Sequence, residues 1–318
     1  MTKENRISKI KDILINNNTY FILLLMFIIS SFLSDTFLTS MNLRNIALQQ
    51  SGPILVAIGM LFVVLTGGID LSVGSIMAVG ASVAAILIRD GMNFIPAILI
   101  AMCVGMMFGI FTGFMVAYGK FQGFVASLAT MTIARGTAFV FTNGTPIKLA
   151  DGTLNNIVKK EFMFPIIIIA AIIVIIFALV QKFTGWGRIV IAIGSNSTAV
   201  QLAGIRTKHY LLSVYAISGI LSALAGVFIA ARASTGSATV GMGQELDAIA
   251  ACVIGGASLA GGKGFVVKTV AGAFVLALIG NIMNLMAVPS YPQDIIKGFI
   301  IIAAVLLQIV TNKSEKTV

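Results

Sequence analysis

The sequence predicts an all-α fold: a polytopic transmembrane helical bundle of about ten spans, some short or re-entrant, in a single domain over residues 1–318. Hydrophobic residues make up 58% of the chain and charged residues only 10%, whereas soluble domains carry about 25% charged residues. The mean hydropathy is +1.04. The 32 glycines fit closely packed membrane helices, because small residues let backbones approach. The solvent of such a chain must be lipid.

The spans follow from length, because a helix needs about 20 mostly apolar residues to cross a bilayer. The candidates lie near 20–34, 46–66, 71–88, 95–117, 123–142, 162–181, 211–232, 245–260, 265–287 and 293–310. The basic start of the chain and the apolar run at 20–33 resemble a signal peptide. No small-x-small cleavage site follows that run, so an uncleaved first helix is expected.

Basic residues predict the orientation. The chain has 21 Lys and Arg and a net charge of +10, but these residues lie at the ends of apolar runs rather than in one cluster, so nucleic acid is not an expected partner. With alternating spans, the larger share falls on one side, which the positive-inside rule assigns to the cytoplasm. We therefore expect a multi-pass protein of the cell (cytoplasmic or inner) membrane, with both termini cytoplasmic. Residues 143–161 would then lie outside and 182–210 inside.

No motif for catalysis is present in the sequence. The run AGGKG at 260–264 fails as a P-loop, because Ala257 stands where the first glycine belongs and Gly264 replaces the Ser or Thr that would hold magnesium. His209 is the single histidine, and Cys103 and Cys252 form no metal-binding pattern. We therefore expect no catalytic residues, no metal and no cofactor. Any ATP hydrolysis must come from another polypeptide.

The candidates for functional intramembrane charge are Asp70, Arg135, Glu245 and Asp247. Intramembrane charge is costly and often functional, but acidic residues near a helix N-terminus also stabilise that terminus. Both interpretations stay open. The glycine-rich segments 67–74 and 255–264 allow two interpretations as well: broken helices that line a solute path, since irregular backbone at membrane depth must be enclosed, or close helix crossings.

The inner loop at 185–210 contains a predicted short helix. Ser195, Asn196 and Ser197 are good N-caps, TAVQLA can form about two turns, and Gly204 can end the helix. At helical spacing Ala199, Val200 and Ala203 share one face, which predicts a small apolar patch. That patch could dock on a cytoplasmic partner, or the segment could be an ordinary interfacial helix.

Three long strings resemble the permease subunits of ribose-type ABC importers, a family that includes permeases for ribose, xylose and galactose. They are LTGGIDLSVGS at 65–75, GRIVIAIGSNSTAVQLAGI at 187–205 and GQELDAIAACVIGGASLAGGKG at 243–264. TNGTPI at 142–147 and the tail SYPQDIIKGFIIIAAVLLQ extend the resemblance over nearly the whole chain. TNGTPI and SYPQ are most similar to ribose permeases.

The resemblance implies an ATP-driven sugar importer, with ribose as the first choice and with another sugar, a furanosyl signalling solute or a nucleoside as alternatives. It implies three partners: a cytoplasmic ATPase, an extracytoplasmic sugar-binding protein and a second permease copy, a homodimer being expected. It assigns ATPase coupling to Gly194, Asn196, Ala199, Gly204 and Ile205. It assigns the translocation path or family motifs to Asp70, Ser72, Gly74, Glu245, Asp247, Gly255 and Gly256.

Two rivals remain from other classes. A secondary transporter driven by protons or sodium would use Asp70, Glu245 or Asp247 as its ion site. A membrane enzyme is the other rival, although the sequence lacks the histidines and metal-binding clusters that most such enzymes need.

Overall fold

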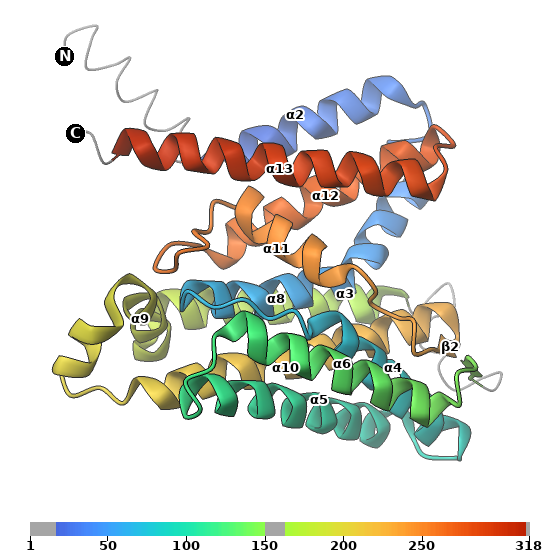
Figure 1. The fold of residues 1–318 in the computed structure, drawn as a ribbon. Coiled ribbons are helices and arrows are strands. Elements are labelled where there is room, and N and C mark those ends of the chain that lie inside the picture. Colours follow the sequence, from blue (N-terminus) through green and yellow to red (C-terminus); the bar gives the residue numbers. More distant parts are fainter. Residues whose placement is uncertain (1–16, 150–162, 316–318) are drawn as a thin grey trace, which may run out of the picture.

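The computed structural model describes residues 17–149 and 163–315, and nearly all of its secondary structure is helical (Figure 1). The predicted all-α class is confirmed. The helices are α2 (Asn18–Leu33), α3 (Ser40–Leu65), α4 (Val73–Arg89), α5 (Phe94–Ala117), α6 (Gly123–Thr142), α8 (Met163–Phe183), α9 (Gly185–Leu202), α10 (Thr207–Ala233), α11 (Gln244–Ile254), α12 (Val266–Leu285) and α13 (Ser290–Glu315). Two short strands, β1 (Ile147–Lys148) and β2 (Thr235–Gly236), pair antiparallel. The basic N-terminus and most of the predicted outer loop lie outside the described residues.

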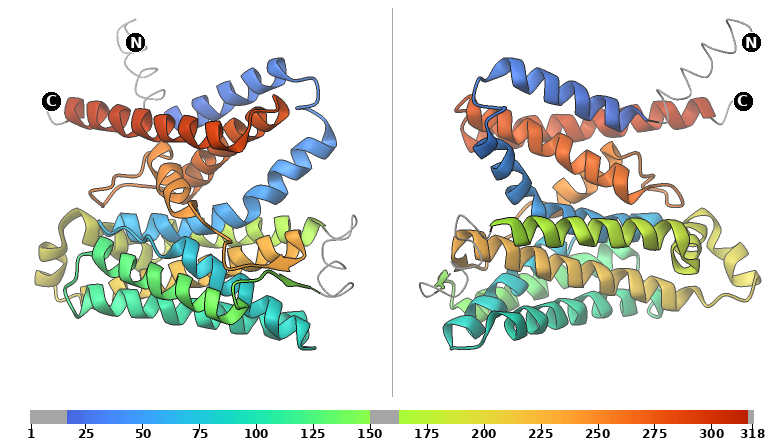
Figure 2. Two further views of the ribbon diagram at one scale, coloured as in Figure 1. Left: turned by 45° about the vertical axis from the view of Figure 1, so that its right-hand side comes forward. Right: turned by 180° about the vertical axis from the view of Figure 1, so that it is seen from behind.

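The helices form two groups that α3 joins. One group contains α4, α5, α6, α8 and α10, and the other contains α2, α11, α12 and α13 (Figures 1 and 2). Helix α3 leaves the second group and enters the first, packing on α10 and α8 as well as on α11 and α12. The long axes of most helices run in one common direction, as in a bundle that crosses a bilayer.

The connections gather at two opposite ends of the bundle. The α9 end holds α9, the turn at 118–122 and the loop at 255–265, whereas the strand end holds β1, β2 and the turns at 34–39 and 286–289 (Figure 1). Helix α13 ends at the α9 end. These turns therefore alternate between two ends, as the order of the predicted spans requires.

Six helices among the described residues are long and apolar enough to cross a membrane: α3, α5, α6, α10, α12 and residues Pro165–Phe183 of α8. The predicted span at 245–260 is helical only as far as Ile254. Its 11 residues rise about 16 Å at 1.5 Å per residue, roughly half of the hydrocarbon thickness. The predicted span at 71–88 begins as a helix only at Val73, after an irregular stretch that follows α3. The predicted span at 245–260 is thus interrupted, whereas α4 covers the predicted span at 71–88 except for its first two residues.

Burial separates inner helices from lipid-facing ones. Residues 73–85 of α4 are buried on every side, as expected for a helix that is apolar all round. The apolar windows of α3 and α10 are 83% and 78% buried, whereas those of α5 and α8 are only 22% and 17% buried. Large side chains such as Phe114 and Ile175 lie exposed on these outer helices. An apolar outer surface of this extent requires lipid.

Helix α10 packs closely on α4 and α5 because glycines stand at the crossings. A β-carbon on Gly226 of α10 would lie well inside van der Waals contact with the carbonyl oxygen of Met77 in α4. At the other crossing, a β-carbon on Gly105 of α5 would lie 2.5 Å from the carbonyl oxygen of Gly219. Since backbone atoms cannot move aside singly, both positions require glycine.

The first prediction concerns this contact. Replacing Gly226 with Ala should lower the midpoint of thermal unfolding in detergent, because overpacking costs about 1–3 kcal/mol. Gly136→Ala in α6 is the matched control, since a β-carbon there meets nothing within 4 Å and Ala is the better helix former. Equal midpoints for the two variants would contradict the proposed packing.

Candidate functional site

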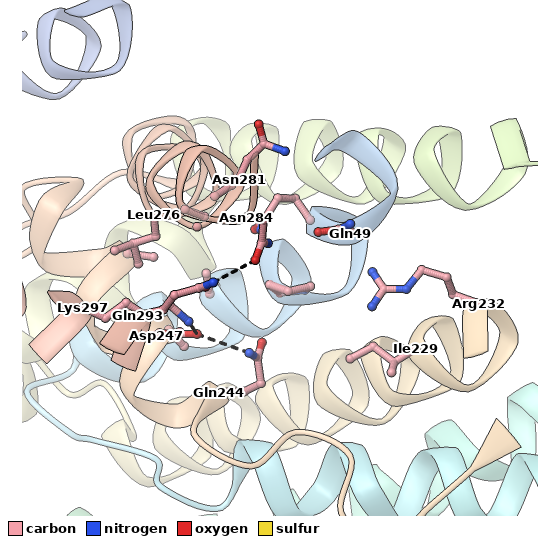
Figure 3. Close-up of a pocket in the computed structure, with 18 residues that line it drawn as sticks. Gln49, Ile229, Arg232, Gln244, Asp247, Leu276, Asn281, Asn284, Gln293 and Lys297 are labelled. Atoms are coloured by element: carbon pink, nitrogen blue, oxygen red, sulfur yellow. Dashed lines mark hydrogen bonds and ion pairs between the residues drawn. The ribbon is translucent and has the colours of Figure 1, made fainter. Parts of the chain in front are cut away.

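A polar cavity lies between the two helix groups (Figure 3). Its volume is about 260 Å³, just below the typical range of about 300–1,000 Å³ for small-molecule sites. It is lined by Gln49, Gln50, Pro53 and Ala57 of α3, Ile229 and Arg232 of α10, Gln244, Asp247, Ala248 and Ala251 of α11, Ala273, Leu276, Ala277, Gly280, Asn281 and Asn284 of α12, and Gln293 and Lys297 of α13.

The cavity extends from the middle of the bundle toward the strand end. It is lined by residues 49–57 in the middle of α3, the end of α10, residues 273–284 of α12 and the beginning of α13. Each of these segments adjoins a connection at the strand end. The short α11 forms one wall, so the interruption after Ile254 places this wall in the same half of the bundle.

Amide side chains dominate the polar lining of the cavity. The 18 lining residues include Gln49, Gln50, Gln244, Asn281, Asn284 and Gln293. Each amide offers both donors and an acceptor. Such a lining suits a neutral solute with many hydroxyl groups better than it suits an apolar or highly charged one.

Hydrogen bonds and one ion pair connect α11, α12 and α13 across the cavity (Figure 3). The Lys297 ammonium lies 3.8 Å from the Asp247 carboxylate, which also accepts a hydrogen bond of 3.4 Å from Gln244. Gln293 donates to the Asn284 amide oxygen at 2.9 Å. Helix α13 is thereby connected to both other helices beside the cavity.

Asn281 is held in place from outside the cavity. Its amide and that of Asn42 exchange two hydrogen bonds of 2.8 and 3.1 Å, and Asn42 also donates to the carbonyl oxygen of Phe37. This pair connects α3 to α12 near the strand end. It fixes the orientation of one lining amide, as a preorganised site requires.

Asp70 lies away from the cavity, fully buried in the irregular segment between α3 and α4. Its carboxylate accepts hydrogen bonds from the backbone N–H and hydroxyl of Ser72 and from the Ser218 hydroxyl of α10 at 2.8 Å. The hydroxyl of Tyr215 is also buried, and a β-carbon on Gly68 would lie 2.7 Å from it. Asp70 therefore joins the start of α4 to α10.

The other residues that the resemblance assigned to the translocation path make separate contacts elsewhere in the bundle. Glu245 lies on the α4 side of α11, where a β-carbon on Gly74 would meet its carboxylate. Gly255 packs on the backbone of α12 at Lys268, and Gly256 is exposed in the following turn. Of the seven residues assigned to the path or family motifs, only Asp247 lines the cavity.

Arg135 of α6 has a structural partner of its own. Its guanidinium donates to the carbonyl oxygens of Ala238 and Val240 at 2.6 and 2.8 Å. Those residues belong to the loop between β2 and α11. Arg135 thus holds the segment that leads into the short helix, which accounts for its charge at this depth.

Helix α9 has the predicted cap and the predicted stop. Asn196 is non-helical, with φ −162° and ψ 92°, and its side-chain oxygen accepts a hydrogen bond from the Ala199 N–H at 3.0 Å. Gly204 follows the last turn with φ +79°, and the Ile205 N–H donates back to the Val200 carbonyl oxygen. The helix begins earlier than expected, however, at Gly185, and Asn196 kinks it.

The prediction of an exposed apolar patch on this helix is wrong for one of its three residues. Ala199 and Ala203 are exposed, but Val200 is only 8% exposed and packs inward. Leu202, which the periodicity did not single out, is 84% exposed. Spacing shows which residues of a helix are neighbours but not which of them the rest of the protein covers, so it could not identify Val200 as the inward residue.

Sequence reasoning also missed the amides of the cavity. Gln49 and Gln293 are separated by most of the chain, and no local motif connects them. The one available signal was a set of polar side chains within otherwise apolar spans near 46–66, 265–287 and 293–310. Their convergence depends on helix packing that the sequence does not reveal.

The second prediction concerns the Asp70 contacts. Asp70→Ala should lower the free energy of unfolding by about 2 kcal/mol, because three donors lose their acceptor inside the protein. Asp70→Asn should recover part of the loss, since an amide oxygen can still accept. Asp90→Ala is the control, because the exposed Arg89–Asp90 pair contributes little. A wild-type thermal midpoint for Asp70→Ala would refute this structural role.

Comparison with known proteins identifies the chain as a transport component. Residues 42–305 match the family described as "Branched-chain amino acid transport system / permease component". The ribose import permease protein of Haemophilus influenzae is 38% identical, over 96% of this chain and 97% of that protein. That of Escherichia coli K12 is 40% identical, over 92% of each.

More distant relatives carry other sugar names. The xylose transport system permease protein of Haemophilus influenzae is 32% identical, over 95% of this chain and 98% of that protein. The L-arabinose transport system permease protein of Escherichia coli K12 is also 32% identical, over 92% and 90%. No solved structure matches the chain. The match over most of its length, together with the apolar helical bundle, establishes that this chain belongs to the family of membrane permease components.

Proposed function

We propose that this chain is the membrane-spanning permease subunit of an ATP-driven (ABC) sugar importer and that the sugar it transports is ribose. The observation that carries the proposal is the amide-lined cavity within the bundle of a chain related over nearly its whole length to proteins named ribose import permeases. Xylose, arabinose and galactose remain alternatives, as do a furanosyl signalling solute and a nucleoside, because their hydroxyl groups offer the same hydrogen-bonding chemistry.

The finer topology belongs to the same proposal. The α9 end faces the cytoplasm, so that the chain crosses the cell (inner) membrane about ten times with both termini inside. Helices α4 and α11 then fill only part of the membrane depth, and irregular segments complete their crossings. This orientation places the cavity in the outer half, where a sugar released by an extracytoplasmic binding protein would arrive.

The proposed energy source is a separate cytoplasmic ATPase. The part of α9 after Asn196 projects from the bundle with Ala199 and Leu202 exposed, which supports its role as the docking element. Gly194, Asn196, Gly204 and Ile205 shape that helix from within. A second permease copy completes the importer. ATP and the loaded binding protein shift the equilibrium between inward and outward states by binding them with different affinity.

The ion-driven rival lacks a well-placed ion site among the described residues. Asp247 already faces the Lys297 ammonium, and Asp70 receives three hydrogen bonds within the protein. Glu245 lies on the α4 side of α11, away from the cavity. These contacts favour structural roles for the acidic residues and a neutral solute in the cavity.

The third prediction tests the energy source. The chain, reconstituted in vesicles with its ATPase and binding-protein partners, should take up labelled ribose only when ATP is present on the ATPase side. A proton or sodium ionophore should leave the initial rate unchanged, since no ion gradient drives the step. Uptake that persists without ATP and collapses with the ionophore would favour the secondary transporter.

The fourth prediction tests the solute route. Gln49→Leu should lower the efficiency of ribose uptake about fivefold, because one neutral hydrogen bond contributes about 1 kcal/mol. Gln122→Leu is the matched control, since Gln122 is equally exposed but lies at the α9 end, outside the cavity lining. Equal uptake by the two variants would exclude Gln49 from the route.

A further inference from the structure

Three chain segments that are distant in sequence meet at the α9 end. They are the last residue of α3, the part of α9 before its kink, and the loop that follows α11. The Gly262 N–H of this loop donates a hydrogen bond of 2.9 Å to the Leu65 carbonyl oxygen. A β-carbon on Gly194 of α9 would lie well inside contact with that same oxygen and 2.6 Å from the Gly262 nitrogen. We call Leu65, Gly194 and Gly262 the junction.

The loop side of the junction is equally close-packed. A β-carbon on Gly261 would lie 2.9 Å from the Gly194 carbonyl oxygen and 2.9 Å from the Gly67 nitrogen. A β-carbon on Gly262 would lie 3.0 Å from both the nitrogen and the α-carbon of Ser195. Backbone therefore packs closely on backbone at Gly194 and Gly261, and at Gly262 the loop packs on the backbone and the hydroxyl of Ser195. Contacts of this kind transmit displacement because closely packed elements move together.

Gln181 holds the same loop at a second point. This buried side chain, in the last turn of α8, donates to the Gly264 carbonyl oxygen at 2.8 Å and accepts from the Val266 N–H at 2.9 Å. Helix α9 begins only four residues later. The α8–α9 corner is thus fastened both to the loop after α11 and to the first turn of α12.

The junction stands between the docking element and the cavity. Gly194 comes two residues before the kink at Asn196, so it is the contact of α9 with the junction that lies nearest along the chain to the projecting part. From Leu65 the chain continues into the segment that Asp70 fastens to α10. From Gly262 the loop runs back to α11, whose Asp247, Ala248 and Ala251 line the cavity.

We propose that the junction is the contact through which movement of α9, driven by the ATPase, reaches the cavity wall formed by α11. Gly194 is accordingly a positioning residue inside the protein rather than part of the docking surface. The proposal rests on the proposed function as an ATP-driven permease. It adds the route by which energy passes from one end of the bundle to the other.

The test uses the full importer in vesicles and measures the ratio of sugar moved to ATP hydrolysed. In the fraction of Gly194→Ala complexes that assembles and hydrolyses ATP, that ratio should fall about tenfold, within the usual range for coupling between two sites. Gly185→Ala, at the start of the same helix with nothing within 4 Å of its β-carbon, should keep the wild-type ratio.

A second pair of variants enters the junction from the loop. Asn tolerates left-handed backbone better than most residues, so Gly262→Asn keeps the backbone conformation at φ +75°. Its β-carbon must displace the Ser195 hydroxyl, which is the end of a movable side chain, and presses on the Ser195 backbone at 3.0 Å. This variant should lower the ratio as Gly194→Ala does, and it decides the matter if Gly194→Ala fails to assemble. Gly91→Asn, at φ +94° in open space, is its control.

Each outcome bears on a single claim. A lower ratio of sugar moved to ATP hydrolysed in the junction variants, but not in the controls, supports the junction as the route by which α9 moves the cavity wall. A wild-type ratio in Gly262→Asn or in an assembled Gly194→Ala overturns it, even though the importer still works. If the wild-type complex itself moves no sugar with ATP, the proposed function fails first.

Discussion

The structure depends on how it encloses the irregular backbone that follows α3 and α11. Where water is excluded, each backbone N–H and C=O must find a partner inside the protein, and the chain leaves helical geometry between α3 and α4 and again after α11. The Asp70 carboxylate meets this requirement in the first break, where it accepts the Ser72 N–H and the Ser218 hydroxyl. In the second break, Leu65 accepts the Gly262 N–H and Gln181 binds both Gly264 and Val266. Without these contacts neither interruption would be stable.

The interruptions also create what a transport protein needs. A complete helix at α11 would continue past Ile254, and the loop could not reach Leu65 and α9. Because α11 stops after 11 residues, it forms a cavity wall in one half of the bundle while its following loop contacts the other end. One short helix therefore serves both the solute cavity and the junction. The glycines at 255–264 permit this geometry, because Gly261, Gly262 and Gly264 all adopt positive φ.

Much of the fold could be predicted from local pattern. Apolar length placed α5 and α6 within a residue or two of their observed bounds, and capping chemistry identified Asn196 and Gly204. Local sequence patterns did not predict the features that depend on how the helices pack together. Helical spacing could not show that the bundle covers Val200, and the glycines at 255–264 allowed a broken helix without deciding that the apolar run at 245–260 stops being helical at Ile254. The cavity could not be predicted, because its amides come from four helices and converge only after folding.

The account as a whole claims that a solute cavity opens at the strand end while energy arrives at the α9 end. The most direct measurement is accessibility of a single cysteine in the cavity. With Cys103 first replaced, Gln49→Cys is placed in oriented vesicles and exposed to a membrane-impermeant thiol reagent. Labelling from the extracytoplasmic side, at a rate that changes when ATP is supplied to the ATPase, is the expected result. Labelling only from the ATPase side, or at a rate that ATP leaves unchanged, would contradict the account.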